Sequence, residues 1–104
     1  MNRLPQLVKL LELQPDDPMT KYMIALEYKK ENDDKCREYF LDLKDNHPQY
    51  LPTYYIAGEY FYNINEHEIS AEFLTKGLEI ALEANNTKTY NEIKNLLFNV
   101  EMEM

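Results

Sequence analysis

The sequence predicts an all-α fold built from antiparallel helical hairpins. Apolar residues recur three and four positions apart, the period of an amphipathic helix, and strand-like alternation of apolar and polar residues does not persist. The segments between these periodic stretches are short, and short connections force consecutive helices to run antiparallel. The third observation is an internal repeat in which the second half of the chain reproduces the spacing of the first.

Six helices are predicted along the 104 residues. The stretches "QPDDP", "END", "NHPQYLP", "NIN" and "ANNT" separate them, and each is rich in residues that end or begin helices. No stretch is rich in glycine or serine, so we expect no interdomain linker. The predicted ranges are Leu4–Leu13, Pro18–Lys30, Asp34–Asn46, Pro52–Asn63, Glu66–Ala84 and Thr87–Met102.

The composition narrows the classes of partner. The chain carries 19 acidic and 11 basic residues, a net charge of −8. Because phosphate groups attract basic patches, neither nucleic acid nor a membrane surface is expected as a partner. No apolar run approaches the roughly 20 residues that cross a bilayer, and the first residues do not resemble a signal peptide. We therefore expect a cytoplasmic protein.

The internal repeat relates two hairpins. A displacement of 33 residues (Ile24 to Ala57) superimposes their first helices, and a displacement of 34 residues (Cys36 to Ser70) superimposes their second helices. The displacement changes only across the "END" turn, so the first hairpin is expected to be one residue shorter than the second. The matched pairs are Ile24 with Ala57, Ala25 with Gly58, Tyr28 with Phe61, Cys36 with Ser70, Phe40 with Leu74 and Leu43 with Gly77.

This pattern resembles the tetratricopeptide repeat, a helix-turn-helix unit of about 34 residues. In that family the first helix carries a large residue, a Leu-Gly-like pair and an aromatic residue, and the second helix alternates small and large residues. The earlier unit is degenerate, because Lys21 occupies a large apolar position and Leu43 a small one. The later unit fills the family's positions with Tyr54, Ala57, Gly58, Phe61, Ser70, Leu74 and Gly77.

The resemblance covers about Pro15 to Ala84 and implies a short right-handed superhelix, an α-solenoid. It implies one domain over residues 1–104, whose parts are a helix at 4–13, repeats at 18–46 and 52–84, and a C-terminal capping helix at 87–102.

The only two glycines, Gly58 and Gly77, lie in the middle of predicted helices. Each costs about 1 kcal/mol relative to alanine there. We expect them to let two helices approach closely.

The tyrosine-rich stretch 50–63 divides into two helical faces. Tyr54 and Phe61 belong to a predicted core stripe, and a second stripe is rotated by one residue step. In the tetratricopeptide family this second stripe of the first helix lines a concave groove. Asn91 and Asn95 of the last helix could hydrogen-bond a peptide backbone, and the alternative interpretation is that they lie on a solvated helix face. The predicted peptide-binding residues are Tyr22, Leu26, Lys29, Tyr55, Glu59, Tyr62, Lys88, Asn91, Asn95 and Phe98.

Catalytic chemistry is not expected. His47 and His67 stand alone, and no zinc-binding spacing, nucleophile–base pair or glycine-rich phosphate loop is present. Cys36 falls at a small packed position, so it is expected to be buried and unreactive. The sequence therefore predicts no enzyme, no metal site and no cofactor.

The resemblance implies a non-catalytic protein–protein interaction module that binds a peptide or protein segment in its groove. Three lysines, Lys29, Lys30 and Lys88, fall on or beside that groove, so the ligand need not be strongly basic despite the chain's net charge. One chaperone-binding subclass of the family binds C-terminal carboxylates through a clamp of Lys, Asn and Arg. We do not expect that clamp here, because Lys88 alone matches its positions. The alternative is a self-associating scaffold subunit, a homodimer in which the groove or the C-terminal helix packs on another copy.

Overall fold

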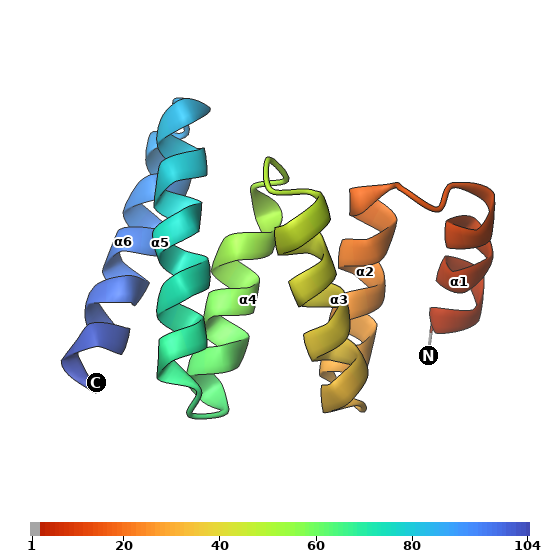
Figure 1. The fold of residues 1–104 in the computed structure, drawn as a ribbon, viewed down its shortest axis with the longest axis horizontal. Helices are drawn as coiled ribbons and strands as arrows, with labels where there is room; N and C mark the ends of the chain where they lie inside the picture. Colours follow the sequence, from red (N-terminus) through yellow and green to blue (C-terminus); the bar gives the residue numbers. More distant parts are fainter. Residues whose placement is uncertain (1–2) are drawn as a thin grey trace. The chain divides into compact units, whose positions relative to one another are not determined.

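The computed structural model describes residues 3–104, which form six helices and no strand (Figure 1). This confirms the prediction of an all-α helical repeat. The first two residues of the predicted domain 1–104 lie outside the described part of the chain. The helices are α1 (Leu4–Leu13), α2 (Pro18–Lys29), α3 (Asp33–Asn46), α4 (Pro52–Asn63), α5 (His67–Glu83) and α6 (Thr87–Met102).

The observed helix bounds differ from the predicted ones by single residues. Helix α2 ends at Lys29 instead of Lys30, α3 begins at Asp33 instead of Asp34, and α5 is one residue shorter at each end. Differences of this size are ordinary, since the terminal residue of a helix makes only part of its hydrogen bonds.

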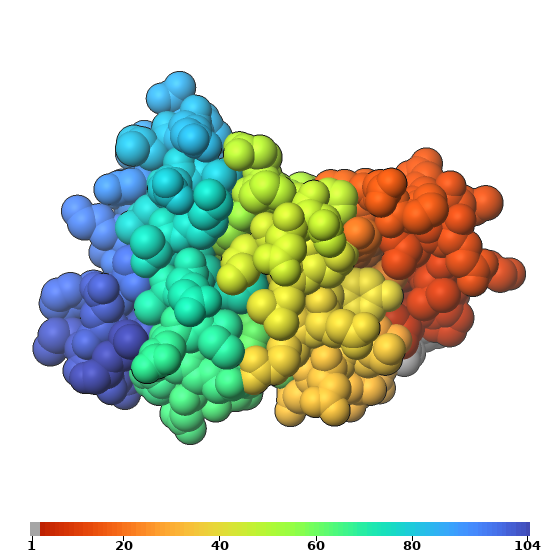
Figure 2. Space-filling model, viewed as in Figure 1, coloured from red at the N-terminus to blue at the C-terminus, as the bar shows by residue number. Residues whose placement is uncertain are grey.

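The chain divides into two compact units, the first ending at Tyr50 and the second beginning at Leu51. In the first unit α2 and α3 form a hairpin and α1 packs against α2. In the second unit α4 and α5 form a hairpin, and α6 packs on both. Figure 2 shows the blue atoms of α6 against the cyan and green atoms of α5. None of the helices formed by residues 3–104 is long and apolar enough to cross a membrane.

Local sequence explains where the helices begin. Three of them start at a side chain that accepts a hydrogen bond from the backbone N–H three residues later, which satisfies a donor left unpaired at the helix start. Three helices also carry proline in the first two positions, where its missing N–H costs nothing. The side-chain caps are Asp17 for α2, Asn32 for α3 and Asn86 for α6.

The turns of the second unit use asparagine in the left-handed conformation. After α4, Asn65 has a φ of 64°, and its N–H bonds to the Tyr62 carbonyl while the Glu66 N–H bonds to the Phe61 carbonyl. This pair of bonds is the Schellman motif. Asn85, with a φ of 55°, ends α5 in the same way.

The turn between α2 and α3 is built differently. Among residues 3–104, only Asn65 and Asn85 have a positive φ outside glycine, so this turn contains no left-handed residue. Instead the N–H groups of Glu31 and Asn32 both bond to the Tyr28 carbonyl, at 3.0 and 2.8 Å. The predicted one-residue slip of the repeat therefore coincides with a change of turn type.

The core of the second unit matches the predicted stripe. Tyr54, Ala57 and Phe61 are completely buried, and the Phe61 ring stacks on Phe73 of α5 with centroids 5.4 Å apart. The centroid of the Tyr54 ring lies 6.4 Å from the centroid of the same Phe73 ring. The aromatic rings of α4 and α5 thus form one continuous cluster.

The two glycines lie where helices come closest. A Cβ atom added at Gly58 would lie 2.4 Å from Leu74 Cδ2, and one added at Gly77 would lie 2.5 Å from Tyr54 Cβ and 2.9 Å from Ile93 Cδ1. The Ser70 hydroxyl donates a 2.7 Å hydrogen bond to the Gly58 carbonyl across the same contact. The expectation that the glycines permit close helix packing is confirmed.

In the first unit, the contact between α2 and α3 is partly polar, because Lys21 takes the position that Tyr54 has in the second unit. Lys21 Nζ lies 2.8 Å from Asp42 Oδ2 and 3.2 Å from His47 Nε2, and its side chain is only 12% exposed. Asn46 donates a 2.5 Å hydrogen bond to the other oxygen of Asp42. Burial acts to raise the pKa of Asp42, but these hydrogen bonds from Lys21 and Asn46 lower it below its usual value.

Candidate functional site

The second stripe of α4 forms a partly exposed surface beside the core. Tyr55, Glu59 and Tyr62 are half-buried, whereas Tyr54 and Phe61, one residue step away, are fully buried. Residues spaced by four and three positions lie on one face of a helix. The helix therefore presents one face to the core and an adjacent face of two tyrosines and a carboxylate at the surface of the second unit.

Two carboxylates act electrostatically on the Tyr55 end of this surface. Burial raises the pKa of the Tyr55 hydroxyl, and the negative charges of Glu59 and Glu92 raise it further. Glu59 lies one turn along α4, while Glu92 comes from α6. The charges of acidic side chains on two helices thus act on Tyr55, which stays a neutral hydrogen-bond donor at physiological pH.

The Tyr62 end of the surface contacts the end of α6. The Tyr62 hydroxyl donates a hydrogen bond to Glu103 Oε2, and this bond, with burial, raises the pKa of Tyr62. The Tyr62 ring also meets the His67 ring edge to face, with centroids 5.3 Å apart. His67 Nε2 lies 3.9 Å from Glu103 Oε2, so the same carboxylate oxygen is near both the Tyr62 hydroxyl and the His67 ring.

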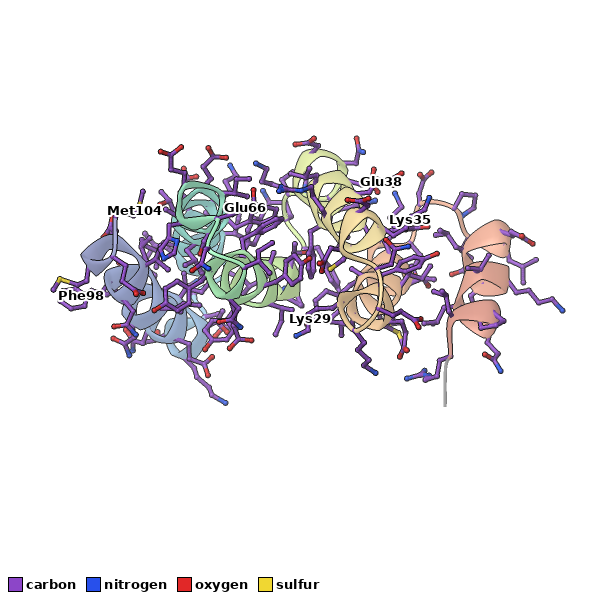
Figure 3. All side chains as sticks on the ribbon, turned by 90° about the horizontal axis from the view of Figure 1, so that it is seen from below. Lys29, Lys35, Glu38, Glu66, Phe98 and Met104 are labelled. Carbon is purple, nitrogen blue, oxygen red and sulfur yellow. The ribbon has the colours of Figure 1, made fainter. Side chains whose placement is uncertain are left out.

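The four predicted residues of α6 lie at increasing angles from Glu92 around the helix. Lys88 and Asn95 stand one turn on either side of Glu92, so they flank the face that approaches Tyr55. At about 100° per residue, Phe98 lies some 120° around the helix from Glu92, and Asn91 about 100°. All four side chains are exposed, and Figure 3 shows Phe98 pointing away from α4 and α5.

The predicted residues of the first unit lie on α2. Tyr22, Leu26 and Lys29 are all half-buried and share one helix face. The Tyr22 ring meets Tyr50 edge to face, with centroids 5.8 Å apart. Burial raises the pKa of Tyr22, and the neighbouring Tyr50 adds to the effect. This face is therefore also aromatic and partly exposed.

Glu92 and Glu103 were not among the predicted site residues. Their spacing of eleven positions places both on one face of α6, which the sequence shows. It does not show that this face meets the tyrosines of α4, because that depends on how α6 packs across the hairpin. No local signal identifies the two carboxylates as neighbours of Tyr55 and Tyr62.

Potential metal-binding side chains are scattered over the described residues. Within residues 3–104, no three His, Cys, Asp or Glu side chains come together in a way that could hold a metal ion. The Cys36 side chain is completely buried, as its position in the repeat predicts.

Comparison with known proteins identifies the fold. No protein-family model and no curated protein matches the chain. A solution structure of a tetratricopeptide repeat domain protein from Salinibacter ruber matches 84% of this chain and 89% of its own, with 27% identity and a TM-score of 0.77. The chain has the tetratricopeptide-repeat fold. A crystal structure of a tetratricopeptide repeat domain protein from the same organism agrees, with 27% identity and a TM-score of 0.75 over 82% of this chain and 97% of that one.

The tetratricopeptide-repeat fold gives the two stripes their context. Domains of this kind are in general protein-interaction modules, and the helix hairpin is their repeating unit. The hairpins α2–α3 and α4–α5 correspond to such units, and α1 and α6 flank them. The half-buried faces of α2 and α4 are the same face of the first helix in each unit.

Proposed function

We propose that this protein is a non-catalytic interaction module that binds an extended peptide or protein segment on the half-buried face of the first helix in its units. The observation that carries the proposal is the division of α4 into a fully buried stripe and an adjacent tyrosine stripe. A tyrosine ring that the core does not need, placed on a rigid helix, offers contact area and a hydrogen bond at low entropic cost.

The chemistry of the second unit's surface favours a particular type of segment. Tyr55 and Tyr62 offer flat rings, and Glu59 and Glu92 add carboxylates on two helices. Lys88 and Asn95 flank Glu92 with a cation and an amide. A segment carrying both apolar and polar side chains would match this mixture, and a single basic side chain would find a carboxylate within reach.

The proposal is tested with a phage-displayed library of random peptides selected on the wild-type protein. Binding of the selected peptides is then measured by fluorescence anisotropy for wild type and for Tyr55→Ala/Tyr62→Ala. We expect the double variant to bind at least about tenfold more weakly, since aromatic anchors commonly contribute more than 1 kcal/mol each. Circular dichroism checks that it remains folded, because both side chains lie outside the core stripe.

Tyr39→Ala is the matched control. Tyr39 is also a half-buried tyrosine, but it lies on α3, where it stacks on Tyr28 with centroids 5.9 Å apart. Its removal should leave peptide binding unchanged. Selected peptides that bind the double variant as tightly as wild type, or a selection that enriches no peptide on wild type, would contradict the proposal.

A further inference from the structure

The outward face of α6 is an exposed surface that neither the core nor the tyrosine stripe uses. Ile93 and Val100 are fully buried and define the inner side of the helix. On the opposite side Phe98 is 62% exposed and Met102 is 71% exposed, one turn apart. Figure 3 shows Phe98 at the outer side of α6. Two large apolar side chains are thus presented together to solvent.

Charged and amide side chains border this apolar pair. Lys94 precedes Phe98 by one turn, and Glu101 follows it by about one turn on the same edge of the face. Asn91 lies one turn before Lys94, toward the start of the helix. All of these residues are exposed. The outward face of α6, as named from here on, consists of Asn91, Lys94, Phe98, Glu101 and Met102.

This arrangement is complementary to itself when reversed. Suppose that two copies of α6 pack antiparallel, with Phe98 of one against Phe98 of the other. A residue a few positions before Phe98 then lies opposite the residue about as many positions after Phe98 in the partner. Lys94 of one copy then faces Glu101 of the other, and the two-fold symmetry makes this pair twice. In a parallel two-fold pair, the edge that carries Lys94 and Glu101 would face the opposite, uncharged edge of the partner helix, so neither ion pair would form.

We infer that the outward face of α6 binds a second copy of this chain in an antiparallel, two-fold symmetric helix pair. Phe98 and Met102 of both copies form its apolar centre, and two Lys94–Glu101 pairs fix its direction. The inference does not depend on peptide binding at the tyrosine stripe, because Phe98 lies on a different side of α6 from Glu92.

The size of the face sets the strength expected. One helix face buries less than the roughly 1,600 Å² of a standard interface, so the dimer should be weak and depend on concentration. We expect a dissociation constant on the order of 100 μM. Sedimentation velocity from about 10 μM to about 1 mM spans this range. A wild-type protein that stays monomeric throughout would overturn the inference.

Charge reversal tests the antiparallel arrangement. Lys94→Glu and Glu101→Lys should each weaken the dimer about tenfold, because each places like charges opposite one another. The double variant Lys94→Glu/Glu101→Lys restores both pairs with reversed direction and should dimerise like wild type. Single variants that dimerise normally, or a double variant that does not recover, would refute the antiparallel pairing.

Two further variants separate this face from other exposed apolar residues. Phe98→Glu should abolish the dimer without loss of helix content, since the side chain is exposed. Leu82→Glu alters an equally exposed apolar residue, 68% exposed, on α5 and should leave the dimer intact. Loss of the dimer in Leu82→Glu but not in Phe98→Glu would place the contact elsewhere.

Discussion

The two units build the same hairpin with different side chains. In the second unit glycines bring the helices into close contact, and an aromatic cluster of Tyr54, Phe61 and Phe73 fills the hairpin. In the first unit Lys21 stands where the second unit has Tyr54, and it links α2 to α3 through Asp42. The backbone pattern of a helix hairpin therefore tolerates either an apolar or a partly ionic contact at the same position.

The contrast continues at the small positions of the repeat. Gly58 and Gly77 of the second unit correspond to Ala25 and Leu43 of the first. Leu43 is fully buried, so the first unit accommodates a large side chain where the second has none. Gly77 contacts residues of both α4 and α6, so two helices of the second unit pack against this one position.

The largest expected difference between the units concerns their corresponding aromatic residues. Phe61→Ala removes a fully buried ring and should cost about 4 kcal/mol of unfolding free energy. Tyr28→Ala, its counterpart in the first unit, removes a half-buried ring and should cost about 1 kcal/mol. Urea denaturation followed by circular dichroism measures both. Equal losses would show that the two units depend on this position equally.

Gly77→Ala should produce the next largest effect. The added Cβ would overlap Tyr54 Cβ, which is fixed to the backbone of α4, so a loss of about 2–3 kcal/mol is expected despite alanine's higher helix propensity. The reverse change in the first unit is Ala25→Gly at the counterpart of Gly58, which should cost about 1–2 kcal/mol through helix propensity and the loss of one buried methyl group. A stabilised Gly77→Ala protein, by thermal denaturation, would mean that the close contact is not needed.

Lys21→Met tests the ionic contact of the first unit. The variant should lose about 1 kcal/mol at neutral pH, because the pair with Asp42 is partly exposed. The pKa of Asp42 is lowered in the folded protein, so its contribution is present above the unfolded value of about 4 and lost as pH falls through the lower folded value. Lys21→Met should therefore lose less stability than wild type between neutral pH and pH of about 2, measured by acid titration.

Tyr54→Phe should have the smallest effect at neutral pH. Burial raises the pKa of Tyr54 to about 12, and the charge of Glu79 adds to the shift. Because the pKa of Tyr54 is higher in the folded protein, the neutral Tyr54 side chain stabilises the fold fully below pH of about 10, the pKa of the unfolded chain. This stabilisation is lost as the pH rises toward the folded pKa of about 12. Tyr54→Phe should shift alkaline unfolding to higher pH. An unchanged alkaline midpoint would show that other tyrosines dominate the transition.

The sequence by itself determined the helices and the core face of the second unit. Side-chain caps such as Asp17 and Asn32, and the asparagine-containing turn at Asn65, act within a few residues, so the linear pattern records them. The buried stripe of Tyr54 and Phe61 follows from helical periodicity, because one face of an amphipathic helix must leave water. The close packing at the two glycines followed from their cost in mid-helix.

Only the tertiary structure decided which residues from different helices meet. Helical periodicity places Glu92 and Glu103 on one face, but the crossing of α6 over α4 is what brings them to Tyr55 and Tyr62. Contacts of this kind depend on interhelical angles set by the packing of many side chains, and no local spacing records such an angle.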